Sequence, residues 1–271
     1  MKITIIGGNG LVGARLAGTL RHRGHEVVAT SRRSGVDALT GHGLAHAVAG
    51  SRVVIDVMNS PSLDGDAVLD FFSTAGRNLL AAEATAHVRH HIALSIVGTD
   101  RLQHSDYFRA KLLQEELIQA SPIPHTILRS TQFFEFLPRI AEPDHDGRAV
   151  RVPPVLVQPI AVQEVASALA DLTTQAPRNG MLEHAGPECF QLDALVHQVL
   201  QANHDTREVI ADIHARYFGA TLERDTLVPD EGAIVGVARF GDWLKQSIEP
   251  GLFQLALPCA TALEPLPAVR T

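Results

Sequence analysis

Short apolar runs alternate with longer, helix-like segments through the first half of the chain. The runs are rich in β-branched residues and continuously apolar, as expected for strands that helices cover on both faces. The segments between them repeat apolar residues at helical spacing, and the last begins at Ser105, a residue type suited to capping a helix. The pattern predicts strands over 3–6, 26–30, 53–57, 91–96 and 126–128, and helices over 11–23, 40–49, 66–84 and 105–120. This alternation is typical of an α/β protein with a doubly wound parallel sheet.

Beyond residue 129 the chain is divided into short pieces by prolines. A helical pattern returns over 162–173, and it is followed by a strand pattern over 181–184 and by helical patterns over 192–202 and 240–248. We expect a first domain over 1–137 and a smaller C-terminal α/β lobe over 138–250, which is interleaved with the first domain and covers the substrate. The stretch over 251–271 shows little periodicity and is expected to be a poorly ordered tail.

Charge and composition narrow the class of partner. The formal net charge is -7 and the isoelectric point is about 6.0, whereas a protein that binds nucleic acid normally presents a basic face. The two cysteines, Cys189 and Cys259, lie far apart, and no apolar run approaches the roughly 18 residues of a membrane span. His87, His90 and His91 come nearest to a metal cluster, but adjacent strand residues face opposite sides. We therefore expect a cytoplasmic protein with a small-molecule substrate, and no nucleic acid, membrane or metal as partner.

A glycine-rich turn lies between the first predicted strand and the first predicted helix. In this context Gly7 lets the chain leave the strand tightly, Gly10 lets the backbone approach a pyrophosphate, and Gly13 lets the helix pack closely on the sheet. Free N–H groups at the helix N-terminus favour an anion. The turn predicts a Rossmann sheet that binds a dinucleotide, although a purely structural turn is the alternative. The expected contacts are Gly7, Asn9, Gly10, Leu11, Val12 and Gly13.

The end of the second predicted strand indicates which dinucleotide is bound. An NAD-binding protein usually carries an acidic residue there for the ribose hydroxyls, but this chain reads Thr30-Ser31-Arg32-Arg33. A guanidinium forms paired hydrogen bonds with a 2′-phosphate, which an acidic side chain would repel. We therefore expect NADP(H) to be preferred over NAD(H), with Ser31, Arg32 and Arg33 in the phosphate site. The alternative is that both arginines are solvated surface charges.

Several segments that follow the glycine turn and the arginine pair match one family in order. They are Leu94-Ser95-Ile96-Val97-Gly98-Thr99-Asp100, Tyr107-Phe108-Arg109-Ala110-Lys111, and the shorter pieces at 127–130, 159–166 and 185–188. With them, residues 1–250 resemble the atypical short-chain dehydrogenase/reductases, specifically their NmrA-like branch. The resemblance implies an NAD(P) cofactor at the glycine turn. It also implies a substrate cleft at the carboxyl ends of the strands, beneath a small C-terminal lobe.

The resemblance further implies a catalytic set of Ser95, Tyr107 and Lys111, the family's serine followed by Tyr-x-x-x-Lys. Four residues apart on a helix, Tyr107 and Lys111 share a face, so we expect the ammonium to lower the pKa of the phenol and to hydrogen-bond the nicotinamide ribose. Tyr107 then protonates the substrate oxygen while Ser95 holds it. The alternatives are that Ser95 only caps a strand end and that Tyr107 is a surface-anchored aromatic residue, as in relatives that keep the lysine without a working tyrosine.

Loops next to these strands supply the remaining expected cofactor contacts. Met58, Asn59 and Ser60 follow the third predicted strand, where the family passes the chain beneath the cofactor, although an ordinary turn would have the same sequence. The segment after Arg33 is shorter than in fuller relatives, which have a complete strand there that ends in Gly-Asp. Asp37 is the remaining candidate for contact with the adenine.

Functions of different classes remain open. The first is an NADPH-dependent oxidoreductase that reduces a small or mid-sized apolar carbonyl compound, with Tyr107 as proton donor. Phe133 and Phe134 would then line an apolar substrate pocket, although both would fit equally well in a core. The second is an NmrA-like NADP(H)-binding protein that senses redox state without turnover, and an isomerase or dehydratase with tightly held cofactor is a further alternative. The full set of Ser95, Tyr107 and Lys111 favours the enzyme.

Overall fold

A parallel seven-stranded sheet forms the centre of the molecule in the computed structural model, which describes residues 1–63, 65–141 and 149–247. The strand order is β11-β8-β5-β4-β3-β1-β2, and each neighbouring pair is parallel. The predicted doubly wound Rossmann sheet is thus confirmed. Its strands are β1 (Lys2–Ile6), β2 (Glu26–Thr30), β3 (Val53–Asp56), β4 (His90–Ile96), β5 (His125–Ser130), β8 (Gly180–Ala185) and β11 (Ile234–Val235).

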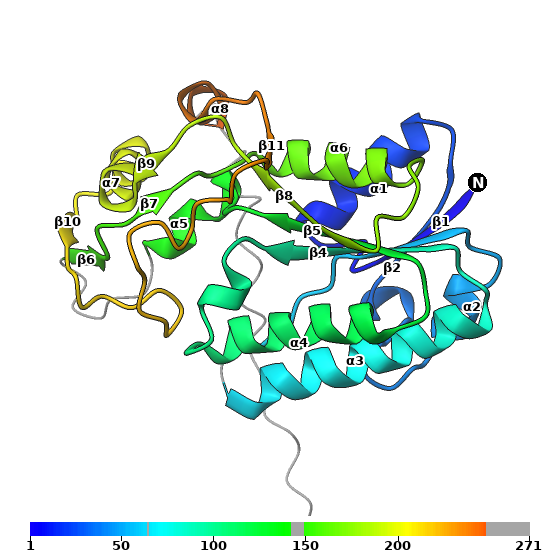
Figure 1. Cartoon of the computed structure of the whole chain (residues 1–271). Coiled ribbons are helices and arrows are strands. Elements are labelled where there is room, and N and C mark those ends of the chain that lie inside the picture. Colours follow the sequence, from blue (N-terminus) through cyan, green and yellow to red (C-terminus); the bar gives the residue numbers. More distant parts are fainter. Residues whose placement is uncertain (64, 142–148, 248–271) are drawn as a thin grey trace, which may run out of the picture.

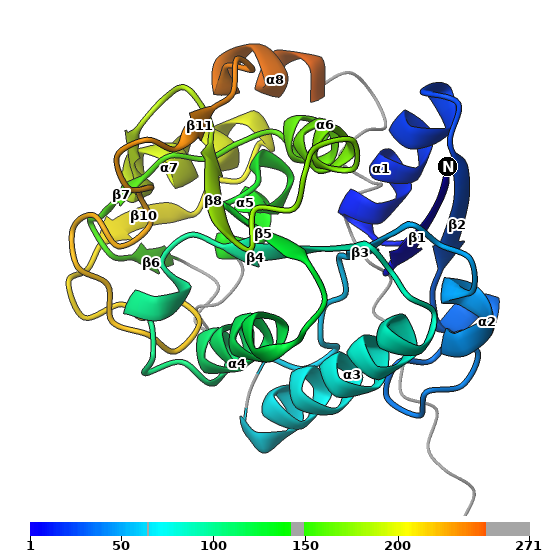
Figure 2. The ribbon, with the colours of Figure 1, turned by 45° about the vertical axis from the view of Figure 1, so that its right-hand side comes forward.

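Helices cover both faces of the sheet, as the continuously apolar strands require (Figures 1 and 2). On one face α1 packs against α6, and their apolar residues form one core with Ile3 and Ile5 of β1. On the other face α3 packs against α4, and Leu79 of α3 meets Ile6 and Val54. These helices are α1 (Leu11–His22), α6 (Val162–Leu172), α2 (Leu44–Val48), α3 (Gly65–Thr85) and α4 (Asp106–Ala120).

A second lobe stands beyond the carboxyl ends of the central strands (Figure 1). Its two small sheets pair β10 with β6 and β7 with β9, and its core is built around Phe134, Leu195, Tyr217 and Phe240. Its elements are α5 (Leu137–Ile140), β6 (Ala149–Val152), β7 (Leu156–Val157), β9 (Phe190–Gln191), α7 (Leu192–Ala202), β10 (Glu208–Ala211) and α8 (Phe240–Ser247). Short 3₁₀ turns are η1 (Arg32–Ser34), η2 (Thr99–Arg101) and η3 (Phe134–Phe136).

Two segments from the second half of the chain, β8 and α6, pack in the first lobe. Strand β8, which the sequence assigned to the second lobe, pairs with β5 in the central sheet, and α6 lies on α1. Segments of the described residues 149–247 therefore lie in both lobes, while the predicted division into a first domain over 1–137 and a second lobe over 138–250 stays a prediction. The expected tail over 251–271 lies outside the described residues.

The strongest departure from the predicted elements lies between β2 and β3. The sequence predicts a helix over 40–49, whereas α2 spans only Leu44–Val48. Gly41 and Gly43 both have a φ of +76°, in the left-handed region that interrupts a right-handed helix. Strand β2 forms an edge of the sheet, which agrees with the shortened segment after Arg33.

Candidate functional site

The glycine turn is fixed by its contacts with two strands. Gly7 has a φ of +85°, and a Cβ atom there would lie 2.7 Å from the carbonyl oxygen of Val57. The N–H groups of Gly7 and Gly8 both donate to the carbonyl oxygen of Thr30, at 3.1 and 2.8 Å. A Cβ atom on Gly13 would overlap the carbonyl oxygen of Gly7. Gly7 and Gly13 thus have the steric roles that the sequence predicts.

The beginning of α1 suits an anion. Gly10 occupies the N-cap position without a side-chain cap, and the first turn of the helix contains no acidic residue. Gly10 and Leu11 are exposed, whereas the side chain of Val12 is buried in the core, so that Val12 presents only its backbone. The uncapped N–H groups and the helix dipole therefore favour a phosphate at this end.

The arginine pair stands exposed beside the turn. Asn9 Nδ2 donates to Ser31 Oγ at 2.7 Å, which joins the glycine turn to the end of β2. Arg32 and Arg33 follow in η1, and within the described ranges the structure gives neither guanidinium a hydrogen-bond or ion-pair partner. Both are free to meet a phosphate. Asp37 is half-buried, and its Oδ1 accepts from Leu39 N at 2.9 Å, so its contact with adenine stays a prediction.

The loop after β3 links the glycine turn to Tyr107. Its first residues, Val57 and Met58, abut Gly7. Asn59 is exposed, and its Oδ1 accepts a hydrogen bond of 3.1 Å from the Tyr107 hydroxyl. Ser60 is buried, and its N–H donates to the same Asn59 oxygen at 3.0 Å. The structure thus brings Asn59 and Tyr107, predicted for cofactor and catalysis, into direct contact.

Tyr107 lies half-buried in the first turn of α4, between the cores of the two lobes. Burial raises the pKa of its phenol to about 12. The expectation that Lys111 lowers this pKa is therefore wrong, because burial outweighs any such effect. The phenol stays protonated at neutral pH, which is the state that a proton donor needs.

Lys111 is turned into the interior, where its side chain is 3% exposed. Its ammonium donates to the carbonyl oxygen of Leu94 at 2.9 Å and to Gln114 Oε1, and it lies 4.9 Å from the centre of the Phe72 ring. Gln114 in turn donates to Asp56 Oδ2 at 2.7 Å. Burial lowers the pKa of Lys111 to about 8, against the opposing charges of Asp56 and Glu115. In this arrangement the lysine ties α4 to β4 and β3.

Ser95 is buried near the carboxyl end of β4. Its Oγ has no partner at hydrogen-bonding distance in the described part of the chain. The structure therefore does not join Ser95 to Tyr107 or Lys111 by a hydrogen bond. Ser105, the expected helix cap, likewise occupies the N-cap position of α4 without making a capping hydrogen bond.

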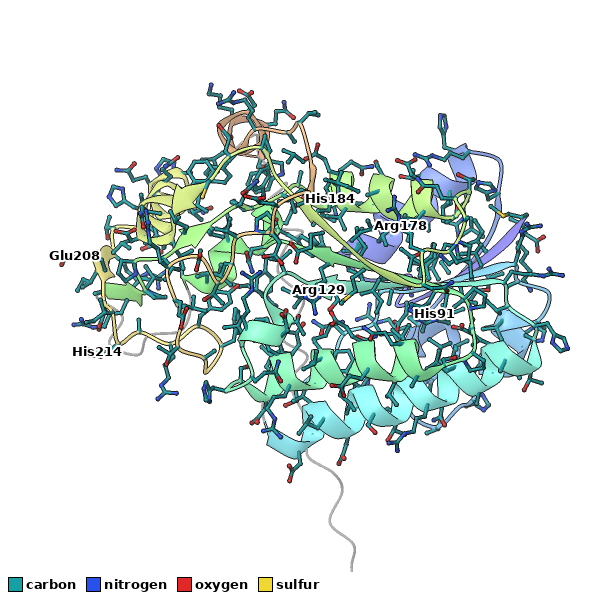
Figure 3. The ribbon with its side chains drawn as sticks, viewed as in Figure 1. His91, Arg129, Arg178, His184, Glu208 and His214 are labelled. Atoms are coloured by element: carbon teal, nitrogen blue, oxygen red, sulfur yellow. The ribbon has the colours of Figure 1, made fainter. Side chains whose placement is uncertain are left out.

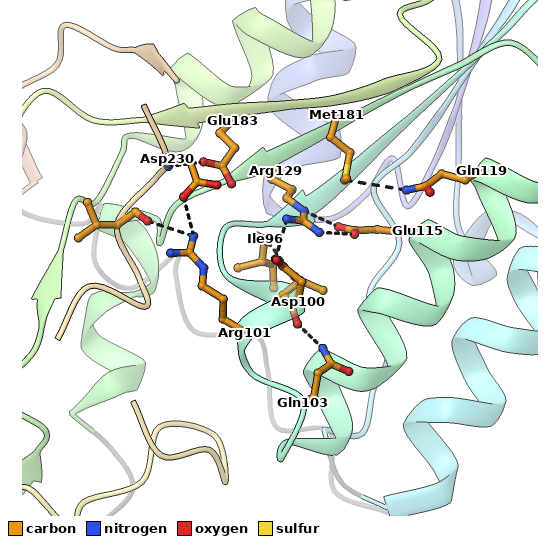
Figure 4. A network of polar contacts seen from close by, with 12 residues as sticks. Ile96, Asp100, Arg101, Gln103, Glu115, Gln119, Arg129, Met181, Glu183 and Asp230 are labelled. Atoms are coloured by element: carbon orange, nitrogen blue, oxygen red, sulfur yellow. Dashed lines mark hydrogen bonds and ion pairs between the residues drawn. The ribbon is translucent and has the colours of Figure 1, made fainter. Parts of the chain in front are cut away.

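An ion-pair network fixes the middle of α4 to the sheet. Arg129 of β5 donates to both carboxylate oxygens of Glu115, at 3.0 and 2.7 Å, and to Asp100 Oδ1 at 2.7 Å (Figure 4). Arg129 and His91 lie between the sheet and the layer of α3 and α4 (Figure 3). Since Glu115 follows Lys111 by one helical turn, this network orients the helix that carries Tyr107.

The predicted pocket residues fall in different places. Phe134 is fully buried, with its ring 5.4 Å from the centres of both Phe240 and Trp243, so it belongs to the core of the second lobe. Phe133 is half-buried and packs against the core around α1 and α6. Neither makes a ring contact with Tyr107 in the described structure.

Two residues near Tyr107 were missed by the sequence reasoning. Tyr217 lies in the second lobe, stacked on Phe108 with ring centres 6.4 Å apart, and Phe108 in turn touches Tyr107. Gln132 follows β5 and lies near the Tyr217 hydroxyl. The signal available in the sequence was that only two tyrosines occur in the whole chain.

Metal and membrane interpretations receive no support from the described residues. These residues contain no group of three or more His, Cys, Asp or Glu side chains that could hold a metal ion. His90 bonds Thr126 at 2.8 Å, whereas His91 bonds Glu83 at 2.9 Å, so the neighbouring rings have separate partners. None of the described helices is both long and apolar enough to cross a bilayer.

Comparison with known proteins identifies the family of the chain. A model of the NAD(P)H-binding family matches residues 7–176, more than half of the chain. A comparison with curated protein sequences finds no match.

Solved structures resemble the whole fold at low sequence identity, so that the likeness concerns the fold. UDP-glucose 4-epimerase of Thermus thermophilus, in complex with NAD, is 17% identical with a TM-score of 0.70, over 95% of this chain and 100% of that chain. dTDP-4-dehydrorhamnose reductase of Bacillus anthracis, in complex with NADP, is 13% identical with a TM-score of 0.69, over 90% and 97%. A short-chain dehydrogenase/reductase superfamily protein of Agrobacterium tumefaciens with bound NAD is 16% identical with a TM-score of 0.66, over 92% and 96%.

Proposed function

Since this chain belongs to the NAD(P)H-binding family, we propose that it is an NADPH-dependent oxidoreductase that reduces a small or mid-sized apolar carbonyl compound. The observation that carries the proposal is the line of contacts from the glycine turn through Val57 and Asn59 to the Tyr107 hydroxyl. It places a protonated phenol on the same sheet edge as the phosphate-binding turn. Ligands of open α/β sheets bind along this edge.

The residues at the other end of the site suit NADPH. The 2′-phosphate would lie on Arg32 and Arg33, whose guanidinium groups are exposed and hold no partner among the described residues. The pyrophosphate would lie on the backbone of Gly10 and Leu11, at the acid-free start of α1. The structural neighbours include proteins with NAD and with NADP, so the preference for NADPH rests on the arginines.

Tyr107 would deliver the proton of the reaction. When bound, the cofactor supplies hydride to the carbonyl carbon. The phenol of Tyr107 gives its proton to the carbonyl oxygen as negative charge develops there. To do so it must exchange Asn59 for the substrate oxygen, because one hydroxyl hydrogen serves one acceptor. The Ser95 Oγ, buried and unpartnered among the described groups, would hold the same oxygen after a side-chain rotation.

The test is Tyr107→Phe, assayed by NADPH oxidation against a panel of aldehydes and ketones. Loss of the proton donor is expected to lower kcat by about a hundredfold or more, with the Kd for NADPH unchanged. A matched Phe71→Leu variant, in the core of α3 and α4 on which Tyr107 packs, keeps the phenol and reports the effect of disturbed packing. Wild-type turnover in Tyr107→Phe would remove the tyrosine from the mechanism.

One observation favours a second function, a redox-sensing NADP(H)-binding protein without turnover. The ammonium of Lys111 bonds Leu94 and Gln114, whereas the reductase chemistry calls for a lysine that bonds the cofactor and acts on the phenol of Tyr107. A sensor needs the cofactor site but no activated phenol. If the protein binds NADPH tightly but oxidises none of it with any compound of the carbonyl panel, the result favours the redox sensor. Conversion of a substrate without net NADPH consumption would instead indicate an isomerase or dehydratase, and the structural neighbours include a UDP-glucose 4-epimerase and an NAD-dependent NDP-hexosamine 5,6-dehydratase.

A further inference from the structure

Gln132 is a buried amide for which the described residues supply no well-formed hydrogen bond. Its side chain follows the carboxyl end of β5 and is 6% exposed, yet neither Oε1 nor Nε2 has a hydrogen-bond partner among the described groups. The backbone around it is fixed, because Ile160 N donates to the Gln132 carbonyl oxygen at 2.8 Å and Phe134 N donates to Ile160 O at 2.9 Å. Burial of an unpaired amide is unfavourable, and folded proteins rarely keep one without a role. A ligand that bonds this amide would supply the missing partner.

Tyr217 of the second lobe approaches the Gln132 amide. It is 5% exposed. Its hydroxyl lies close to both the Gln132 amide and the Tyr107 phenol, since both groups shift its pKa. Backbone hydrogen bonds between Tyr217 and Ala220, at 2.8 and 3.0 Å, close a tight turn that holds the ring against Phe108. Gln132, Tyr217 and Tyr107 therefore converge from three distant segments of the chain.

The surroundings of these three polar groups are apolar and aromatic. The same core includes Phe108, and half-buried Phe136 and Phe218 pack on it with ring centres 5.8 Å apart. Such surroundings disfavour a charged substrate, because a charge would lose its hydration without gaining a partner. A neutral amide can both donate and accept, so Gln132 suits a hydroxyl group or a second carbonyl.

We propose that Gln132 and Tyr217 form a second polar anchor, which binds an oxygen of the substrate remote from the one that Tyr107 protonates. The proposal rests on the proposed function and deepens it by naming the substrate class. The substrate is an uncharged aromatic or alicyclic ketone that carries a second, hydrogen-bonding oxygen. A site that leaves a buried amide unpaired when that oxygen is missing discriminates strongly against the simpler ketone.

Urea unfolding distinguishes a ligand-binding role of Gln132 from a structural role. Replacement of Gln132 by Leu removes an unpaired polar group from an apolar setting, so the urea midpoint is expected to stay the same or rise. Gln114 is the matched control, because it is equally buried but bonds both Lys111 and Asp56. Gln114→Leu is therefore expected to lower the midpoint. If Gln132→Leu lowers it as much as Gln114→Leu does, Gln132 is structural and the proposal is overturned.

Binding tests the anchor directly and without turnover. Calorimetry with the NADP⁺-loaded protein compares acetophenone with para-(hydroxymethyl)acetophenone, which adds one remote hydroxyl. The hydroxylated ketone is expected to bind about tenfold or more tightly, and Gln132→Leu and Tyr217→Phe should each remove most of that advantage while leaving NADP⁺ affinity unchanged. Equal binding of the two ketones by the wild-type protein, or an advantage that survives both substitutions, overturns the proposal. If the Gln132-dependent advantage is found but no ketone is reduced, the anchor stands and the reductase function fails.

Discussion

The Tyr107 hydroxyl donates its hydrogen to Asn59 Oδ1 at 3.1 Å, so that the two residues hold each other at the edge of the sheet. Asn59 comes from the loop that abuts the glycine turn, and Tyr107 comes from the first turn of α4. The contact gives the phenol a resting partner that can be exchanged for a substrate oxygen. It also fixes the protonation state, because Asn59 accepts a hydrogen bond and cannot take the proton away.

The first prediction concerns ionisation of the two tyrosines. Burial raises the pKa of Tyr107 to about 12 and that of Tyr217 as well, so neither is expected to ionise appreciably in the folded protein below about pH 11. The neutral phenols contribute stability that is present below about pH 10 and is lost as the pH rises through the folded value. Phenolate absorbance in the ultraviolet measures this, with the urea-unfolded protein as control. A phenol that ionises in the folded protein near pH 10 or below would contradict the burial of that residue.

The second prediction compares two glycines of α1. Alanine at Gly13 would place a Cβ atom against the backbone of Gly7 and Gly8, where no side chain can rotate away. We expect Gly13→Ala to lower the free energy of unfolding by about 1–3 kcal/mol and to weaken NADPH binding. Gly18 lies on the same helix with no heavy atom within 4 Å of its added Cβ, so Gly18→Ala should be neutral or stabilise by about 0.5–1 kcal/mol. Urea unfolding of both variants measures the two changes in the free energy of unfolding. Equal changes would contradict the prediction.

The third prediction tests the phosphate site. Replacing Arg32 and Arg33 together by alanine should weaken NADPH binding by roughly tenfold to a hundredfold, because charge-assisted hydrogen bonds to the 2′-phosphate are lost. Binding of NADH, which lacks that phosphate, should change little. Arg77→Ala serves as the control, since Arg77 is an equally exposed arginine on α3. Fluorescence titration with both cofactors gives the ratio of the Kd values for NADH and NADPH. If the double variant keeps the wild-type ratio, the two arginines are ordinary solvated surface charges.

The fourth prediction concerns the buried Lys111 ammonium. Its pKa of about 8 lies below the ordinary 10.5, so the folded protein loses this proton before the unfolded chain does. The lysine is therefore destabilising below about pH 8, and its contribution becomes more favourable as the pH rises toward 10.5. Relative to Lys111→Met, the wild-type free energy of unfolding should rise by about 2 kcal/mol between about pH 7 and pH 9.5. Urea unfolding of both proteins at the two pH values measures the change.

A difference between wild type and Lys111→Met that does not vary with pH would show that the ammonium keeps an ordinary pKa. In that case the ammonium of Lys111 would be solvated, or the neighbouring negative charges would offset the effect of its burial. Bound NADPH gives a second condition for the same experiment. If Lys111 turns to the nicotinamide ribose, the pH dependence should weaken when the cofactor is present.

The sequence by itself determined the alternation of elements in the first half of the chain and the place of the glycine turn and of the arginine pair in it. Strands that helices cover on both faces need continuous apolar runs, and such runs can be recognised without knowing their neighbours. The glycines of the turn and the arginines after β2 act through adjacent backbone and local charge, so their positions in the chain are enough to predict them. The Tyr107 and Lys111 pair was recognised from the family resemblance, and its spacing of four residues places both side chains on one helix.

Tertiary structure decided what surrounds the reacting end. The ammonium of Lys111 finds Leu94 and Gln114 only when α4 is packed on the sheet, and the resulting burial sets its pKa. Likewise, Tyr217 meets Gln132 and Tyr107 only because the second lobe folds over the carboxyl ends of the strands. No local spacing encodes these contacts, since they depend on how distant segments pack and which polar groups lose water when they do.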